Sequence, residues 1–115
     1  GATMNVITNT SPAIRFLLVS SQDFVTAAAD AQEIEVAVLP IGSTAWEVLN
    51  ITPTNCGRGW YEITLPVAYT QEEGTLIIEA QGLDTGPWRD MISVWEPASY
   101  QIVMGFKPIR AGAST

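Results

Sequence analysis

The most constraining feature of this sequence is a series of short segments in which apolar and polar residues alternate. The clearest is Glu33–Leu39, where Ile34, Val36 and Val38 fall on one face and acidic residues fall on the other. A period of two indicates a β-strand that is buried on one side only. The chain is therefore expected to be built from strands.

Five further segments have the composition or alternation of strands, and Gly- and Pro-rich turns separate them. They are Ala13–Ser20, Ala45–Leu49, Trp60–Pro66, Thr75–Gln81 and Asp90–Glu96. The turn residues Pro40–Ser43 predict a hairpin between Glu33–Leu39 and Ala45–Leu49. The one helix candidate, Phe24–Ala31, is short and lacks an apolar stripe, so it is interpreted as a loop. Strands at intervals of roughly 8–12 residues indicate an all-β sandwich or barrel.

At 115 residues, the chain is expected to form a single domain. Residues 1–12 are small and polar without periodicity, which predicts an N-terminal arm. Residues 13–96 form the predicted β-sandwich core, with a loop over Ile51–Gly59. Residues 97–115 form a C-terminal extension or arm, which contains one more strand candidate, Tyr100–Phe106.

Composition excludes several classes of function. Five Lys and Arg against twelve Asp and Glu give a net charge of −7, which disfavours nucleic acid and anionic membrane surfaces as partners. No apolar run approaches the roughly 18 residues of a membrane span. The chain has no His, which is the commonest general base and zinc ligand. With Cys56 as its only cysteine, it has no intrachain disulfide or cysteine-only metal site. No catalytic residue, metal or cofactor is expected.

Two groups of residues have side chains suited to a chemical site. Asp23, Asp30, Glu33 and Glu35 supply oxygen ligands, but their spacing matches no calcium loop, so a solvated acidic face is favoured. Arg58 places a cation two residues from the Cys56 thiol, an arrangement found near activated thiols. Without a His to act as base, that thiol is not expected to be a catalytic nucleophile.

Four tryptophans are many for a chain of this length. Trp46 and Trp60 lie in predicted strands, which favours positions in the core or at its rim. Trp88 and Trp95 flank a loop and the C-terminal extension, so they are the better candidates for interface anchors. The alternative is a row of exposed rings that stack on carbohydrate.

Charge divides the chain into an acidic body and a basic end. All twelve acids lie between Asp23 and Glu96, whereas residues 97–115 hold two cations and no acid. The extension contributes four candidate interface residues: Tyr100, Phe106, Lys107 and Arg110. We expect the basic arm to dock on an acidic face of a neighbouring copy.

The order of these segments resembles a known group of domains. The segments that carry the resemblance are FLLVSSQD (Phe16–Asp23), EVAV (Glu35–Val38), GWYEITLP (Gly59–Pro66) and EGTLIIEA (Glu73–Ala80). This order is similar to small Ig-like β-sandwich domains in structural proteins of tailed bacteriophages, over approximately residues 13–96. Two departures are the loop Asn55–Arg58, which lacks an expected acidic residue, and the extension after Glu96.

The resemblance implies an Ig-like antiparallel β-sandwich of about seven strands with extended N- and C-terminal arms. It implies a non-enzymatic structural role in the virion, after synthesis in the cytoplasm of the bacterial host. Expected partners are major capsid or tail proteins and copies of the chain itself. Capsid decoration is the first expectation, and a tail, collar or baseplate component is the alternative. A module that recognises a host-surface glycan is the competing class.

Overall fold

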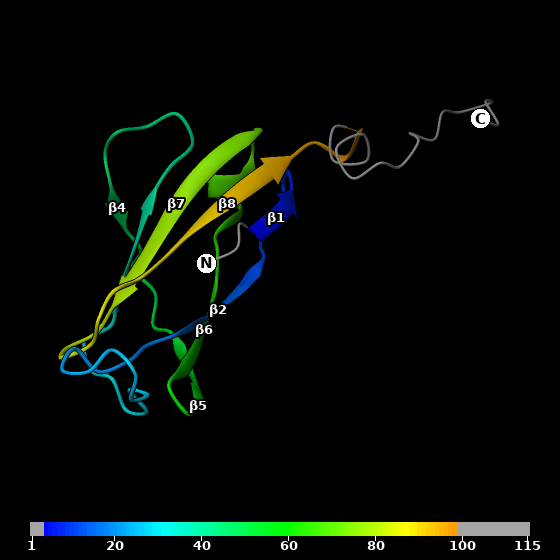
Figure 1. The fold of residues 1–115 in the computed structure, drawn as a ribbon. Helices are drawn as coiled ribbons and strands as arrows, with labels where there is room; N and C mark the ends of the chain where they lie inside the picture. Colours follow the sequence, from blue (N-terminus) through cyan, green and yellow to red (C-terminus); the bar gives the residue numbers. More distant parts are fainter. Residues whose placement is uncertain (1–3, 99–115) are drawn as a thin grey trace.

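The computed structural model describes residues 4–98, which form eight strands and one short 3-10 helix. The strands are β1 (Met4–Ile7), β2 (Ala13–Leu17), β3 (Glu35–Leu39), β4 (Glu47–Val48), β5 (Thr54–Gly57), β6 (Trp60–Thr64), β7 (Gly74–Gln81) and β8 (Trp88–Trp95). The 3-10 helix η1 (Val67–Thr70) connects β6 to β7 (Figure 1). No helix long and apolar enough to cross a membrane occurs within residues 4–98.

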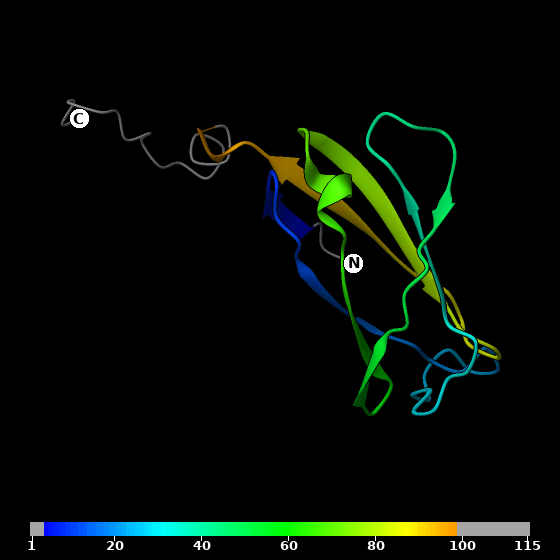
Figure 2. The ribbon, with the colours of Figure 1, turned by 180° about the vertical axis from the view of Figure 1, so that it is seen from behind.

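The strands form two sheets that pack face to face. One sheet has the order β1-β8-β7-β3-β4 and the other has the order β2-β6-β5 (Figure 2). Neighbouring strands are antiparallel except β1 and β8, which are parallel. This is the strand arrangement of an Ig-like sandwich, in which a sheet of β2, β6 and β5 faces a sheet that contains β8, β7, β3 and β4. The predicted fold class and the predicted hairpin between β3 and β4 are both confirmed.

The core lies between the sheets and follows from the alternation along each strand. The residues that are at most 1% exposed include Ile14, Phe16, Leu18, Val36, Val38, Leu65, Leu76, Ile78, Ala80 and Ile92. Three aromatic rings join the sheets. Phe16 stacks on Tyr61 of its own sheet at a centroid distance of 6.0 Å and on Trp88 of the opposite sheet at 5.1 Å. This aromatic stack joins the two sheets without a disulfide, because the only cysteine, Cys56, is free and exposed.

Two strands differ from the expectations drawn from the sequence. Residues 4–12 belong to the sandwich and are not an arm, because β1 pairs with β8 and the Thr8 amide donates to the Trp95 carbonyl at 2.9 Å. The predicted loop 51–59 contains β5. Only Val6 of β1 is buried and all four residues of β5 are exposed, so neither strand shows an alternating pattern. The strand candidate Tyr100–Phe106 lies outside the described residues.

The long connection between β2 and β3 is held by the buried residue Tyr61. The Tyr61 hydroxyl donates a hydrogen bond to the Ala28 carbonyl at 2.7 Å and accepts one from the Ala31 amide at 2.9 Å. A second tie joins this connection to the β7–β8 loop, where the Leu83 amide donates to the Gln32 carbonyl at 2.8 Å. The connection is therefore fixed to both sheets.

We expect Tyr61→Phe to lower the free energy of unfolding by roughly 1–3 kcal/mol, because it leaves the Ala28 carbonyl and Ala31 amide without their partner. Urea denaturation measures this. Tyr69→Phe is the matched control, since the Tyr69 hydroxyl donates only to the exposed Glu47 carboxylate at 2.8 Å. Equal losses in the two variants would contradict the role given to Tyr61.

The tip of the same connection is shaped by Asp23. Its carboxylate accepts hydrogen bonds from the Thr26 hydroxyl and from the backbone amides of Val25 and Thr26, the latter two at 2.9 Å. The Thr26 hydroxyl first, and then the two amides, hold the pKa of Asp23 at about 2. The charged carboxylate therefore favours the folded turn.

Because the pKa of Asp23 is depressed by folding, its contribution is complete above the unfolded value of about 3.9 and is lost as the pH falls through about 2. Amide chemical shifts of Val25 and Thr26 should titrate with a midpoint near pH 2. Asp23→Asn should abolish that titration. A midpoint near pH 4 in the native chain would show that the hydrogen bonds do not form.

Candidate functional site

The outer face of the five-stranded sheet carries a row of apolar side chains. Leu39, Ile77 and Met91 lie opposite one another on β3, β7 and β8. Val48 pairs with Ala37 on the same face, and Trp46 lies two residues before Val48. Met91, Val48 and Trp46 are 47%, 62% and 49% exposed. We call these five side chains (Leu39, Trp46, Val48, Ile77 and Met91) the apolar row.

One end of this face is acidic. Glu33, Glu35 and Glu79 line a hollow of about 270 Å³ beside Leu83. Glu79 is paired with Arg89 at 2.6 Å. Within residues 4–98, no group of three or more Asp, Glu, Cys or His side chains is arranged to hold a metal ion. Asp23 and Asp30 do not line this hollow, so the four acids considered for calcium are not brought together in it.

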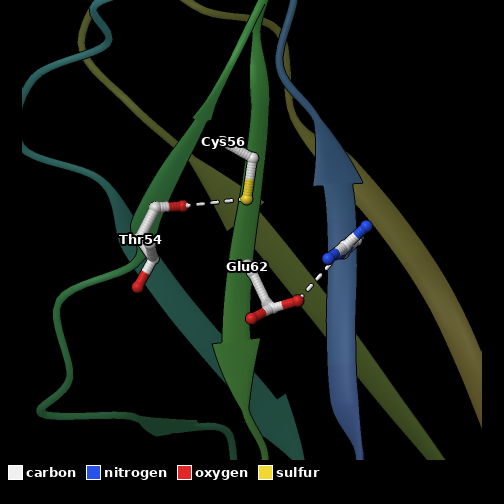
Figure 3. Close-up of polar contacts among 4 residues, drawn as sticks. Thr54, Cys56 and Glu62 are labelled. Atoms are coloured by element: carbon white, nitrogen blue, oxygen red, sulfur yellow. Dashed lines mark hydrogen bonds and ion pairs between the residues drawn. The ribbon is translucent and has the colours of Figure 1, made fainter.

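The outer face of the three-stranded sheet has a different character. A hollow of about 560 Å³ is lined by Arg15, Cys56, Gly57, Arg58 and Trp60, which we call the basic hollow. Residues 4–98 contain three arginines and no lysine, and two of those arginines line it. Figure 3 shows Cys56 beside Thr54 and Glu62. The Cys56 thiol donates to the Thr54 carbonyl oxygen at 3.7 Å.

Strand register brings the arginines and the indole together. Arg15 pairs with Glu62, and Leu17 pairs with Trp60, so Arg15 and Trp60 are diagonal neighbours on adjacent strands. The Arg15 Nε donates to Glu62 Oε1 at 2.8 Å. That hydrogen bond, more than the accompanying charge attraction, raises the pKa of Arg15. The guanidinium is therefore oriented, charged and largely exposed to solvent.

Arg58 occupies an unusual backbone position in the hairpin between β5 and β6. Gly57 pairs with Trp60, which leaves Arg58 and Gly59 as a two-residue turn with φ values of +57° and +88°. Two positive φ values define the type I′ turn, which favours Asn-Gly and similar pairs. An L-residue with a Cβ in this region costs roughly 1–2 kcal/mol. The turn itself does not explain why an arginine stands there.

The structure places the predicted interface residues in different environments. Trp88 is half-buried, with its ring stacked on Phe16. Trp95 is half-buried beside β1, and its indole Nε1 donates to Asn5 Oδ1 at 2.9 Å. The other four candidates, Tyr100, Phe106, Lys107 and Arg110, lie outside the described residues.

The expectation that Trp46 and Trp60 belong to the core or its rim is wrong, because these residues are 49% and 45% exposed. Strand phase explains Trp60, because Tyr61 takes the core face of β6 and adjacent side chains point to opposite faces. Sequence reasoning also missed the role of Arg15. Its distance along the chain from Arg58 hides their proximity, which arises only from the pairing of β2 with β6.

No protein-family model matches the chain, and no curated protein matches it. A crystal structure of the ZIG-8–RIG-5 IG1-IG1 heterodimer is similar at 14% identity and a TM-score of 0.46, covering 82% of each chain. A crystal structure of the ZIG-8 IG1 homodimer is similar at 16% identity and a TM-score of 0.45, covering 83% of this chain and 79% of that one. The assignment to the Ig-like sandwiches follows here from the strand order.

We expect Arg58→Asn to raise the free energy of unfolding by roughly 0.5–1 kcal/mol, because Asn tolerates positive φ better than Arg. Urea denaturation measures the gain. Arg89→Asn removes the same charge from a regular strand position and should give no gain. If both variants gain equally, the cause is the change in net charge and not the turn.

Proposed function

We propose that this chain is a non-enzymatic structural component of a tailed-phage virion, most directly a capsid decoration protein that acts through contacts between subunits. A tail, collar or baseplate component uses the same kind of contact and is the alternative location. The segment order described above, from Phe16 to Ala80, supports the phage assignment. The apolar row is the observation that carries the interface role.

The apolar row has the composition of a protein-binding surface. Exposed Trp46, Val48 and Met91 adjoin half-buried Leu39 and Ile77, so the side chains form one patch across β4, β3, β7 and β8. Contiguous exposed apolar surface marks interaction sites, and Trp and Met are enriched in the centres of interfaces. The exposed Glu79–Arg89 pair borders the patch and supplies a polar rim.

The acidic end of the same face suits the basic C-terminal extension of a neighbouring copy. Glu33 and Glu35 line the hollow at that end, and residues 97–115 carry Lys107 and Arg110 without any acid. Opposite charges on two copies steer association and set its register. The arm of one subunit would then lie beside the apolar row of the next.

The experiment that tests the proposal is incorporation into particles of the source virus. We expect Met91→Lys to reduce the copies per purified particle at least about tenfold, because it places a charge within the apolar row. Val67→Lys is the control, since Val67 is 42% exposed on η1 and is not one of the five residues of the apolar row. Quantitative mass spectrometry of gradient-purified virions measures both variants.

A chain ending at Glu96 tests the arm in the same assay and should fold but fail to incorporate. Full incorporation of that truncated chain would remove the arm from the proposal. Absence of the native chain from all purified particles would overturn the virion assignment itself. Equal incorporation of Met91→Lys and the native chain would show that the apolar row is not the contact surface.

A further inference from the structure

The basic hollow stands out on an acidic molecule and is not used by the proposed assembly contact. Residues 4–98 carry twelve acids and three arginines, yet Arg15 and Arg58 line one hollow. The third arginine, Arg89, lies on the opposite sheet, where it pairs with Glu79. Because the hollow is on the outer face of the other sheet, the apolar row offers no reason for its composition.

Arg58 stands at a backbone position that disfavours it. Its φ of +57° lies in a region that L-residues avoid, and the two-residue turn favours Asn or Gly at this position. Four other non-glycine residues in the described range (Asn9, Phe24, Glu33 and Asp84) also have positive φ, so this strain points to a site only together with the residues around it. Within the described residues, Arg58 forms no salt bridge and no side-chain hydrogen bond, so its guanidinium has no structural task.

Arg15 is positioned to act with Arg58. Its single hydrogen bond in the described part of the chain uses Nε, which donates to Glu62 and fixes the guanidinium plane. The terminal nitrogens remain available, and they are the pair that matches both oxygens of a carboxylate. The Arg15 side chain is 70% exposed, so a ligand can reach these nitrogens from solvent.

Trp60 supplies the third element of the hollow. The register of β6 turns Tyr61 into the core and Trp60 outward, where it is 45% exposed beside the arginines. An indole face carries partial negative charge, which attracts the polarised C–H bonds on the flat side of a sugar ring. Guanidinium groups next to such a face suit a ring that itself bears a carboxylate.

We propose that the basic hollow binds a carboxylate-bearing sugar, with the ring on Trp60 and the carboxylate on Arg15 and Arg58. The hollow of about 560 Å³ lies within the range of roughly 300–1,000 Å³ seen for small-molecule sites. The residues of this site do not include Trp88 and Trp95, which the sequence favoured as interface anchors. Those two rings make contacts within the domain, Trp88 by stacking on Phe16 and Trp95 by a hydrogen bond to Asn5. This site does not depend on the proposed assembly role.

Cys56 lines the same hollow and is the only cysteine, so its alkylation reports occupancy. The experiment measures the rate at which iodoacetamide modifies Cys56 in the full chain, by mass spectrometry, while glucuronic acid or N-acetylneuraminic acid is titrated. We expect either acid to slow alkylation at least fivefold with a saturable dependence. Glucose, acetate and inorganic phosphate at the same concentrations should leave the rate within a factor of two.

Variants assign any protection to the named residues. Arg58→Asn and Trp60→Ser should each reduce the affinity for the acidic sugar at least fivefold, and Arg58→Asn keeps the turn folded. Arg89→Asn should retain the native affinity. Because each variant is compared with and without sugar, a change in the intrinsic reactivity of Cys56 does not affect the result.

Three outcomes would overturn the proposal. Equal protection by acetate or phosphate would reduce the hollow to a general anion site without sugar recognition. Protection by an acidic peptide but not by the sugars would assign it to a protein partner. No protection by any ligand would leave the hollow without a small-molecule role. None of these outcomes affects incorporation through the apolar row, so the two proposals fail separately.

Discussion

The position of Tyr61 determines much of this structure. Its ring joins the aromatic stack through Phe16, and its hydroxyl fixes the β2–β3 connection at Ala28 and Ala31. Since neighbouring strand residues face opposite ways, burying Tyr61 also obliges Trp60 to face solvent. One choice of strand phase therefore places a core ring, a loop anchor and a surface indole together.

The phase of β3 and its hairpin with β4 could be predicted from the sequence, but the pairing of strands distant in the sequence could not. The alternation in Glu33–Leu39 predicted β3 and its buried Val36 and Val38, because burial on one face leaves a period of two. Strands β1 and β5 are held mainly by backbone hydrogen bonds at sheet edges and bury almost no side chain. Backbone pairing leaves no mark on residue choice, so these strands were missed.

The candidate sites show the same division. The local sequence Cys-Gly-Arg-Gly indicates a turn before Trp60, but the outward direction of Trp60 follows only once Tyr61 is known to be buried. The partner Arg15 could not be predicted, because its place depends on the register that sets Arg15 against Glu62. Likewise, the apolar row joins residues from four strands, and only the sheet order makes them neighbours.

Residues 4–98 contain two exposed ion pairs, one on the outer face of each sheet. Arg15–Glu62 and Arg89–Glu79 each join adjacent strands, and exposed pairs of this kind contribute little to stability. Their main effect is to hold a guanidinium in one orientation. On the five-stranded sheet this orientation gives a fixed polar border to an apolar surface. On the three-stranded sheet it presents the free nitrogens of Arg15 to a hollow that also contains Arg58 and Trp60.

The hairpin between β5 and β6 separates what the fold requires from what it tolerates. At Gly59, any Cβ would lie 2.9 Å from Ala27 Cβ and 3.0 Å from the Leu18 carbonyl oxygen, so the closely packed β2–β3 connection excludes a side chain. Arg58 shares the positive φ but carries a long side chain that reaches the exposed hollow. The two-residue turn places both residues at positive φ, so the turn accounts for the backbone strain at Arg58. Packing explains the glycine, and the ligand proposed for the basic hollow would explain the arginine.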